Sequence, residues 1–203
     1  SSDLPKYFLL ENVLMSSKWA DIISEVLGVQ PIMINSSILS GQVRKRLYWT
    51  NIPNITMPKT KDIVFNDIKC NQYHESLVID RKYKATLKPD TDMKQNKSYR
   101  LGGYMKQGQG QRVYYINGKS VCLSALGGGW GAKTGLYLES NGDVRKPTQR
   151  ELERLQTVPE GYTDCLTYTQ ACKVIGNGWT VDVIKHIFKH LKKRNLFIND
   201  IKN

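Results

Sequence analysis

The sequence lacks the features that would place it in a membrane, a disulfide-bonded scaffold or a metal-binding fold. None of its apolar runs approaches the length of a membrane span. Its four cysteines include no C-x-x-C pair, and its three histidines do not lie near them at metal-ligand spacing, so we expect no metal site. Because no secretion signal is recognisable, we expect a protein that is not secreted, with reduced and buried cysteines in the cytoplasm or wherever its partners lie.

Acidic residues are scarce in the middle of the chain. Residues 81–133 hold eleven lysines and arginines but only Asp90 and Asp92 as acids, so this segment carries +9 of the formal net charge of +12. A basic segment with glycines and aromatic residues is typical of a nucleic-acid-binding surface. A lysine-rich solvated surface explains the same charge equally well, and charge alone does not decide between the two.

Apolar patterning predicts an α/β arrangement in the first fifty residues. Residues 7–13 predict a buried strand of the kind found in parallel sheets. A helix with an apolar stripe follows, and Gly28 is placed to end it. Residues 31–34 and 47–50 predict two further strands, and this alternation is typical of an α/β sheet. The stripe consists of Trp19, Ile22, Ile23, Val26 and Leu27.

This pattern stops near residue 53, where polar and glycine-rich sequence begins. Short β-like pieces lie at 77–79, 112–116, 121–123 and 136–138, and Asn117 and Gly118 predict a hairpin turn between the second and third. We therefore predict three parts: an α/β part at 1–75, a small, mostly β domain at 76–142, and closing helices at 143–203. Thr148 and Glu151 form a capping box for a helix to about Gln156, and a last helix starts near Thr180.

Polar residues in four short segments are candidates for a functional site. Glu11 follows apolar residues near the end of the first strand, where ligands bind in open α/β sheets and where burial favours the neutral carboxyl. Arg44 and Arg46 are expected on one face of a strand, where they offer two guanidiniums to a phosphate or a base carbonyl. The third segment, 145–162, is long and distinctive, and the fourth, 175–181, places glycines before a helix. Taken singly, Glu11 and the two arginines are better explained as ordinary strand and surface residues.

Taken together and in this order, the four segments resemble the later motifs of DNA cytosine-5 methyltransferases. Glu11, Asn12 and Val13 resemble the Glu-Asn-Val motif of that family. The other matching residues are Gln42, Arg44 and Arg46 for Gln-x-Arg-x-Arg, Glu151, Arg154, Leu155, Gln156 and Pro159 for the third motif, and Gly176, Asn177 and Val181 for the last. The resemblance spans nearly the whole chain. It implies an α/β fold, the C-terminal part of a Rossmann-like methyltransferase sheet, with 76–142 as an inserted, mostly β target-recognition domain.

The resemblance also implies a reaction and roles for individual residues. S-adenosylmethionine would methylate C5 of a cytosine flipped out of double-stranded DNA. Glu11 would hydrogen-bond or protonate N3 of the base, Arg44 would hold O2, and Arg46 would support the acid or the cysteine loop. Asn177 and Gly178 would contact the cofactor, with Trp179 in the core. The candidate DNA contacts are Arg100, Lys106, Arg112, Gly128, Trp130 and Lys133, around a glycine-rich loop that is otherwise explained as a flexible loop with a buried tryptophan.

Two motifs of that family are absent from the sequence. None of the seven prolines precedes a cysteine, so the attacking thiol of a Pro-Cys motif is missing, as is a glycine-rich motif for S-adenosylmethionine. We therefore expect a chain that is inactive by itself and needs an N-terminal half or companion methyltransferase subunit, which leaves a sheet edge open for pairing. A split enzyme and a fragment explain this equally. A non-catalytic DNA-binding or regulatory homologue is the alternative, and a generic RNA-binding protein would leave the four ordered motifs unexplained.

Overall fold

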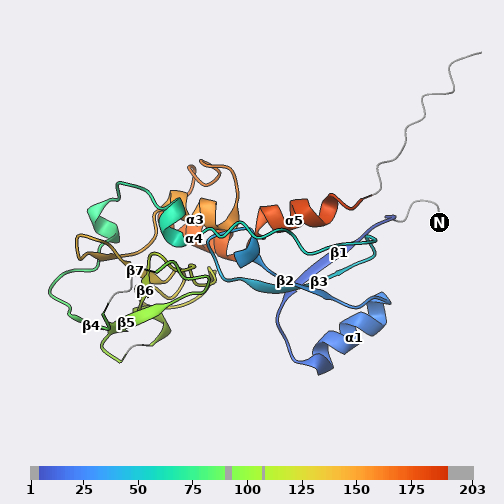
Figure 1. The fold of residues 1–203 in the computed structure, drawn as a ribbon, viewed down its shortest axis with the longest axis horizontal. Coiled ribbons are helices and arrows are strands. Elements are labelled where there is room, and N and C mark those ends of the chain that lie inside the picture. Colours follow the sequence, from blue (N-terminus) through green and yellow to red (C-terminus); the bar gives the residue numbers. More distant parts are fainter. Residues whose placement is uncertain (1–4, 90–92, 107, 192–203) are drawn as a thin grey trace, which may run out of the picture.

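The computed structural model describes residues 5–89, 93–106 and 108–191, which form two lobes (Figure 1). The first lobe contains a three-stranded sheet of order β1-β3-β2, and the second contains a five-stranded sheet of order β4-β5-β6-β7-β8 (Figure 1). The strands are β1 (Leu9–Val13), β2 (Ile32–Asn35), β3 (Lys45–Thr50), β4 (Ala85–Leu87), β5 (Arg100–Tyr104), β6 (Arg112–Tyr115), β7 (Leu136–Leu138) and β8 (Val144–Arg145). The helices are α1 (Ser17–Leu27), α2 (Phe65–Ile68), α3 (Gln149–Gln156), α4 (Tyr168–Asn177) and α5 (Val181–Phe188). No helix in these described ranges is long and apolar enough to cross a membrane.

The first sheet is antiparallel throughout, and this corrects the parallel strand expected at 7–13. Strand β3 lies between β1 and β2 and pairs antiparallel with both, so that β1 and β2 form the two edges. The apolar run of β1 suggested burial on both faces, but Leu10 and Val13 are exposed. One face of the sheet is covered by α5, because Ile34 and Tyr48 share a buried cluster with residues of that helix.

Helix α1 forms where the sequence predicts it, and Gly28 ends it with a φ of +66°. Its inner side contacts the sheet through Ser24, whose hydroxyl accepts a hydrogen bond of 2.9 Å from the indole of Trp49. The expected apolar stripe does not pack into the core: Trp19, Ile22 and Val26 are 58%, 45% and 79% exposed. The spacing of the stripe predicts the helix correctly, but no other part of the described residues covers Trp19, Ile22 and Val26.

The hairpin expected at Asn117 and Gly118 is not formed. The chain turns there, but 121–123 is not a strand, and β6 pairs with β5 and, in parallel, with β7 instead. After the turn, Ser120 forms a parallel bridge with Gln42, and its N–H donates to the Gly41 carbonyl at 2.6 Å. Pairing between the lobes therefore replaces the local hairpin.

The closing helices differ in how well the sequence predicts them. Helix α3 has the expected capping box of Thr148 and Glu151, and α5 begins after Thr180 as expected. Helix α4 was not expected, because it buries only Ala171, Cys172, Ile175 and Gly176 and has no long apolar stripe. It ends at Asn177, so the glycine segment terminates one helix as well as preceding the next. The second sheet continues to β8, and the boundaries at 75 and 142 stay a prediction.

Candidate functional site

Glu11 and Arg46 form an ion pair on the face of the first sheet that α5 covers. Arg46 Nε lies 2.8 Å from Glu11 Oε1, and the two side chains are 14% and 15% exposed. Glu11 pairs with Tyr48 across the strands, two residues from Arg46, so both side chains point to the same face. The sequence placed Glu11 in an apolar setting near the end of the strand. The structure places it in the middle of β1 beside a cation, with both groups partly open to solvent.

The buried side chain of Tyr48 lies next to this ion pair on the same face of the sheet. Burial, with a further contribution from the negative charge of Glu11, raises the pKa of Tyr48 to about 12. Its phenol therefore stays neutral at physiological pH and adds no competing negative charge beside the carboxylate.

The Arg44 side chain is almost fully buried, and both of its Nη groups donate hydrogen bonds, whereas its Nε has no partner among the described residues. Nη1 donates to the Leu123 carbonyl at 2.9 Å and to the Cys122 thiol at 3.3 Å, and Nη2 donates to the carbonyls of Gly176 and Gly178 at 3.2 and 2.9 Å. Burial lowers the pKa of Arg44 from its usual value, against the opposing effect of Cys122. This guanidinium holds three backbone segments together, a geometry that disfavours the base contact expected of Arg44.

The thiol of Cys122 lies between the two arginines. Its Sγ is 3.3 Å from Arg44 Nη1 and 3.8 Å from Arg46 Nη2, so both guanidiniums reach the same point, as expected for a shared face. The expectation that all cysteines are buried is wrong for Cys122 and Cys165, which are exposed. No sequence signal marked Cys122, because it belongs to none of the four motifs and reaches the site through the bridge between Ser120 and Gln42.

Two buried glutamines connect three of the motifs. Gln156 donates to the carbonyls of Ile175 and Gly178, both at 2.9 Å, and accepts a hydrogen bond from Gln42 at 2.9 Å. Gln42 in turn accepts from the Leu123 N–H at 3.0 Å. Both side chains are fully buried, and buried amides are costly to leave unpaired, so this network fixes the relative positions of the segments around the ion pair.

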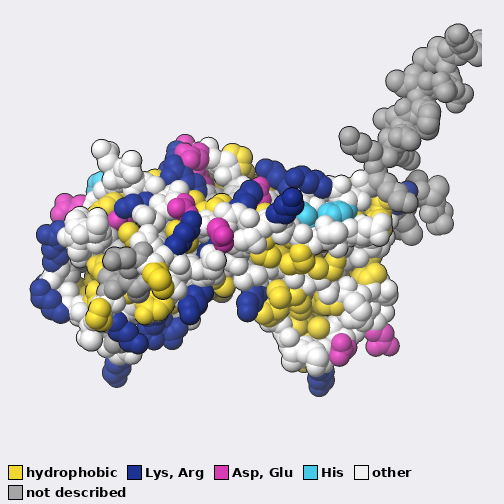
Figure 2. Space-filling model, in the orientation of Figure 1, with side chains coloured by type: hydrophobic (Ala, Val, Ile, Leu, Met, Phe, Trp, Pro, Cys, Tyr) yellow, Lys and Arg dark blue, Asp and Glu magenta, His cyan; other side chains and the backbone are white. Residues whose placement is uncertain are grey.

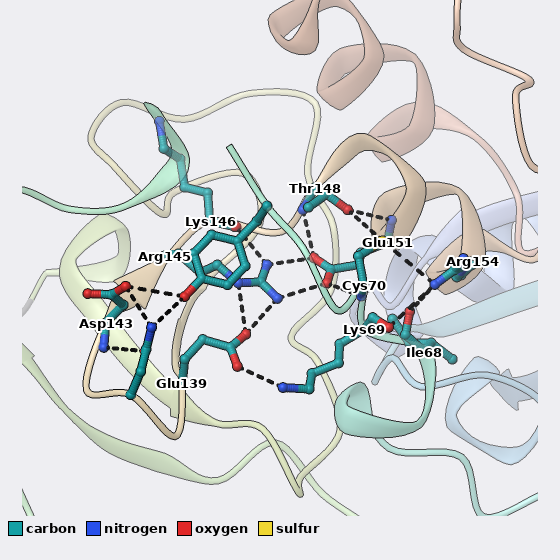
Figure 3. Close-up of polar contacts among 12 residues, drawn as sticks. Ile68, Lys69, Cys70, Glu139, Asp143, Arg145, Lys146, Thr148, Glu151 and Arg154 are labelled. Atoms are coloured by element: carbon teal, nitrogen blue, oxygen red, sulfur yellow. Dashed lines mark hydrogen bonds and ion pairs between the residues drawn. The ribbon is translucent and has the colours of Figure 1, made fainter. Parts of the chain in front are cut away.

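A second buried network lies in the second lobe, where β8 meets α3 (Figure 3). Arg145 donates to both oxygens of Glu151 at 2.7 and 2.8 Å and to Glu139 at 2.8 Å, and Lys69 binds the other oxygen of Glu139 at 2.8 Å. Glu151 also accepts hydrogen bonds from the N–H groups of Cys70 and Thr148, both at 2.7 Å. The third motif therefore braces the second sheet against α3.

Part of the segment with the last motif lies at the surface, although Gly176 is buried. Asn177 is exposed and Gly178 is half-buried, with the Gly178 carbonyl held by Arg44 and Gln156. The expectation that Trp179 fills the core is wrong, because its side chain is 45% exposed. An amide, a section of backbone and an indole are thus available to a ligand next to the Arg44 network.

Two glycine-rich loops meet in the second lobe. Residues 108–111 and 126–129 line one shallow pocket, and the Gly131 N–H donates to the Gly110 carbonyl at 2.8 Å. A Cβ on Gly110 would lie 2.7 Å from the Gly128 carbonyl, so the close approach of the loops requires glycine there. Figure 2 shows lysine and arginine side chains gathered around this lobe.

The residues predicted to contact DNA differ in their exposure to solvent. Lys106, Gly128 and Arg100 are exposed, and Arg100 Nε donates to the Gly102 carbonyl at 3.2 Å. Arg112 and Lys133 are half-buried. The half-buried Trp130 indole packs against the rings of Tyr83 and Tyr104, with centroids at 4.8 and 5.3 Å, so it anchors its loop.

Comparison with solved structures defines the fold class. The chain resembles the Entamoeba histolytica methyltransferase EhMeth with a TM-score of 0.63 and 18% identity, covering 93% of this chain and 64% of that one. It resembles the S. pombe Dnmt2 methyltransferase with a TM-score of 0.60 and 15% identity, covering 92% and 66% of the two chains. At these identities the likeness shows the fold alone, and the predicted α/β, Rossmann-like methyltransferase fold is confirmed.

The family is established by sequence comparison. Residues 30–193 match the model of C-5 cytosine-specific DNA methylases, and the chain belongs to that family. It is 31% identical over 207 residues to the Type II methyltransferase M.HhaI of Haemophilus parahaemolyticus, which covers 90% of this chain and 62% of that protein. The chain thus spans less than two thirds of the length of this relative. Glu11 lies outside the range that matches the family model.

Proposed function

We propose that this chain carries the glutamate and arginine part of the active site, and the DNA-recognition part, of an enzyme that methylates C5 of cytosine in a specific duplex DNA sequence. The observation that carries the proposal is the ion pair of Glu11 and Arg46, held next to the surface residues of the last motif by Arg44 and two buried glutamines. Family membership supports the class of reaction. The enzyme would act wherever its DNA lies.

Negative charge develops on the cytosine ring when a thiolate adds to C6, and this charge must be stabilised at N3 and O2. In the proposed site, the Glu11 side chain in its protonated, carboxylic acid form hydrogen-bonds to N3 or donates its proton there, and is left as a carboxylate beside Arg46, which orients it. Arg46, which is partly exposed and uses Nη1 only for the Lys45 carbonyl at 2.9 Å, faces O2. Arg44 is a positioning residue, because both of its Nη groups already bind backbone carbonyls. This moves the O2 contact from Arg44 to Arg46, and Arg46 keeps the support of the acid that the resemblance implied.

S-adenosylmethionine would supply the methyl group from the side of the last motif. Asn177, Gly178 and Trp179 present an amide, a backbone segment and an indole at the surface, which fits one side of such a cofactor. The remaining contacts and the attacking thiol would come from the glycine-rich and Pro-Cys motifs, which this sequence lacks. By itself the chain is therefore expected to be inactive.

We also propose that the polypeptide with these two motifs, an N-terminal half or a companion subunit, covers the exposed apolar face of α1 and β1. Trp19, Ile22 and Val26 line the outer side of α1, and Leu10 and Met33 lie exposed on the edge strands β1 and β2. Figure 2 shows apolar side chains gathered over this part of the first lobe. Exposed apolar patches of this kind, beside open strand edges, are typical of protein interfaces.

Mass spectrometry of the proteins that co-purify with this chain from its native cells tests that partnership. A companion with a Pro-Cys and a glycine-rich cofactor motif would establish a split enzyme, and the same sequence joined covalently upstream would establish one continuous enzyme. Finding neither, together with a well-behaved monomer at high concentration in ultracentrifugation, would contradict the proposal.

The Glu11→Gln variant tests the chemistry in the complete enzyme. Methyl transfer is expected to fall by about 10²-fold or more, while affinity for duplex DNA stays unchanged, because the amide keeps the shape of the side chain but cannot give the proton. Glu75→Gln, at an exposed carboxylate in the second lobe, is the matched control. Equal loss of binding and transfer, or loss of neither, would defeat this role for Glu11.

A non-catalytic DNA-binding or regulatory homologue is the second candidate, favoured by the missing thiol motif. It predicts sequence-specific DNA binding with no methyl transfer even when the complete set of co-purifying polypeptides is present. A generic RNA-binding protein would instead show no preference for duplex DNA over RNA at moderate salt, which the family membership argues against.

A further inference from the structure

A small pocket lies in the second lobe, between the glycine-rich loop that contains Gly127 and Gly129 and the start of α4. Its volume is about 170 Å³, enough for a phosphate group with several waters. The lining residues include two lysines, two threonines and no acid. They are Gly127, Gly129, Trp130, Lys133, Thr134, Lys146, Tyr168, Thr169 and Cys172. None of the four family motifs supplies Lys133, Thr169 or the tyrosine that closes the pocket.

The two lysines converge on this pocket from different segments with fixed backbones. The Lys133 carbonyl accepts a hydrogen bond from the Ser124 N–H at 2.9 Å, and the Lys146 N–H donates to the Leu77 carbonyl at 3.0 Å. The Lys146 ammonium lies 5.8 Å from the centre of the Tyr168 ring. Within the described part of the chain, neither ammonium forms an ion pair. Two uncompensated positive charges therefore face one small space.

The buried thiol of Cys172 responds to both charges. Burial raises the pKa of Cys172, and the hydrogen bond with Tyr168 and the charges of Lys133 and Lys146 act in the opposite direction. Both lysines are thus close enough to act on one group at the base of the pocket, which agrees with its geometry.

The first turn of α4 adds backbone donors on the same side. Thr167 caps the ten-residue helix: its hydroxyl accepts from the Gln170 N–H and its carbonyl accepts from the Ala171 N–H. The N–H groups of Tyr168 and Thr169 lie ahead of these and have no acceptor within the helix. Thr169 lines the pocket, so these donors supplement the lysines in attracting an anion.

We propose that this pocket binds a phosphodiester group of the duplex DNA, held by Lys133, Lys146 and the first turn of α4. The inference rests on the proposed function and deepens it, because it adds Lys146 and Thr169 to the DNA-binding surface and places one strand of the duplex along the junction of the two glycine loops and α4. A contact of this kind fixes the position of the duplex and carries no sequence information.

The test measures binding of the chain to fluorescent duplex DNA over a range of salt concentrations. Lys146→Gln removes one phosphate contact, so the slope of log K against log salt should fall by about 0.9 and affinity at 0.1 M salt by about eightfold, alike for all sequences. Lys173→Gln, which removes one charge from an exposed position on α4 outside the pocket, is the matched control and should leave the slope unchanged.

Thr169→Asp is a second variant that does not endanger the fold. An acid in the first turn of a helix favours the helix, so stability should hold or rise while the added charge repels the phosphate and weakens DNA binding at least as much as Lys146→Gln. Thr169→Asn, which has nearly the same shape without the charge, should bind nearly as the wild type does.

The outcomes separate this inference from the proposed function. A wild-type chain that fails to bind duplex DNA would refute the proposed function. A wild-type chain that binds, with Lys146→Gln and Thr169→Asp indistinguishable from their controls, would refute the pocket alone. Stabilisation of the chain by inorganic phosphate, lost in Lys146→Gln without any change in DNA binding, would identify a free-anion site and overturn the phosphodiester assignment.

Discussion

Replacing Arg145 by methionine tests whether the buried network of the second lobe supports the fold. The guanidinium is fully buried and donates two hydrogen bonds to Glu151, at 2.7 and 2.8 Å, and one to Glu139 at 2.8 Å. Glu139 would keep Lys69 as a partner, whereas Glu151 would keep only backbone N–H groups and would become a buried charge without a cation. The loss of one partner from a buried pair destabilises by about 3–5 kcal/mol.

For a chain of this length, a loss of that size lowers the melting temperature by about 6–20 °C. The assay is urea and thermal unfolding of the wild type and of Arg145→Met. The control is Arg81→Met: its ion pair with Asp143 is as short, at 2.6 Å, but the Arg81 side chain is 79% exposed, so we expect a much smaller loss of stability than for Arg145→Met. The two ion pairs are similar in length, so the expected difference in stability between the two variants comes from solvent exposure and not from distance.

A double variant gives the sharper result. Adding Glu151→Gln to Arg145→Met removes the unpaired charge and keeps a side chain able to complete the capping box, so it should restore about 1–3 kcal/mol. If Arg145→Met lost no more stability than Arg81→Met, or if the double variant were as unstable as the sum of the single changes, the reasoning from burial would be refuted.

Three further predictions concern other parts of the structure. Gly176→Ala should cost about 1–3 kcal/mol in urea unfolding, because its Cβ would lie 2.4 Å from the backbone of residue 124, whereas Gly128→Ala meets nothing within 4 Å and should be nearly neutral. A thiol reagent should modify exposed Cys122 at least about tenfold faster than Cys172, whose pKa is raised by burial, and equal native rates would contradict the fold around α4. Burial raises the pKa of Glu153, but the hydrogen bonds it accepts from the 161–163 turn outweigh this and hold the pKa below its usual value. The ionised Glu153 carboxylate should therefore stabilise the folded chain at neutral pH, and this contribution should be lost as the pH falls below about 4.3. The difference in urea midpoint between wild type and Glu153→Gln should shrink over the same pH range.

The order of motifs and the local signals in the sequence predicted much of the fold. The capping box of α3 and the glycine that ends α1 act over a few residues, so the sequence determines them directly. The turn at Asn117 and Gly118 was equally clear, but the pairing of the residues after the turn depends on contact between Ser120 and Gln42 in the other lobe. The residues of the turn carry no information about a pairing partner that is distant in the sequence.

The sequence indicated which residues gather at the candidate site better than it indicated how their side chains are arranged. The spacing of Arg44 and Arg46 indicates a shared face, but it does not tell which guanidinium has its donors taken by backbone carbonyls. Cys122 reaches the site only through tertiary pairing. Likewise, the stripe on α1 indicates an amphipathic helix, but it does not tell that Trp19, Ile22 and Val26 stay exposed.

The most direct test of the account is methyl transfer measured with labelled S-adenosylmethionine and duplex DNA. The chain would be assayed by itself, and then together with the polypeptide that precedes or accompanies it in its native cells. We expect 5-methylcytosine only from the complete set, abolished by Glu11→Gln, with no product from the chain by itself. No product from the complete set despite specific DNA binding, or full activity of the Glu11→Gln variant, would contradict the account.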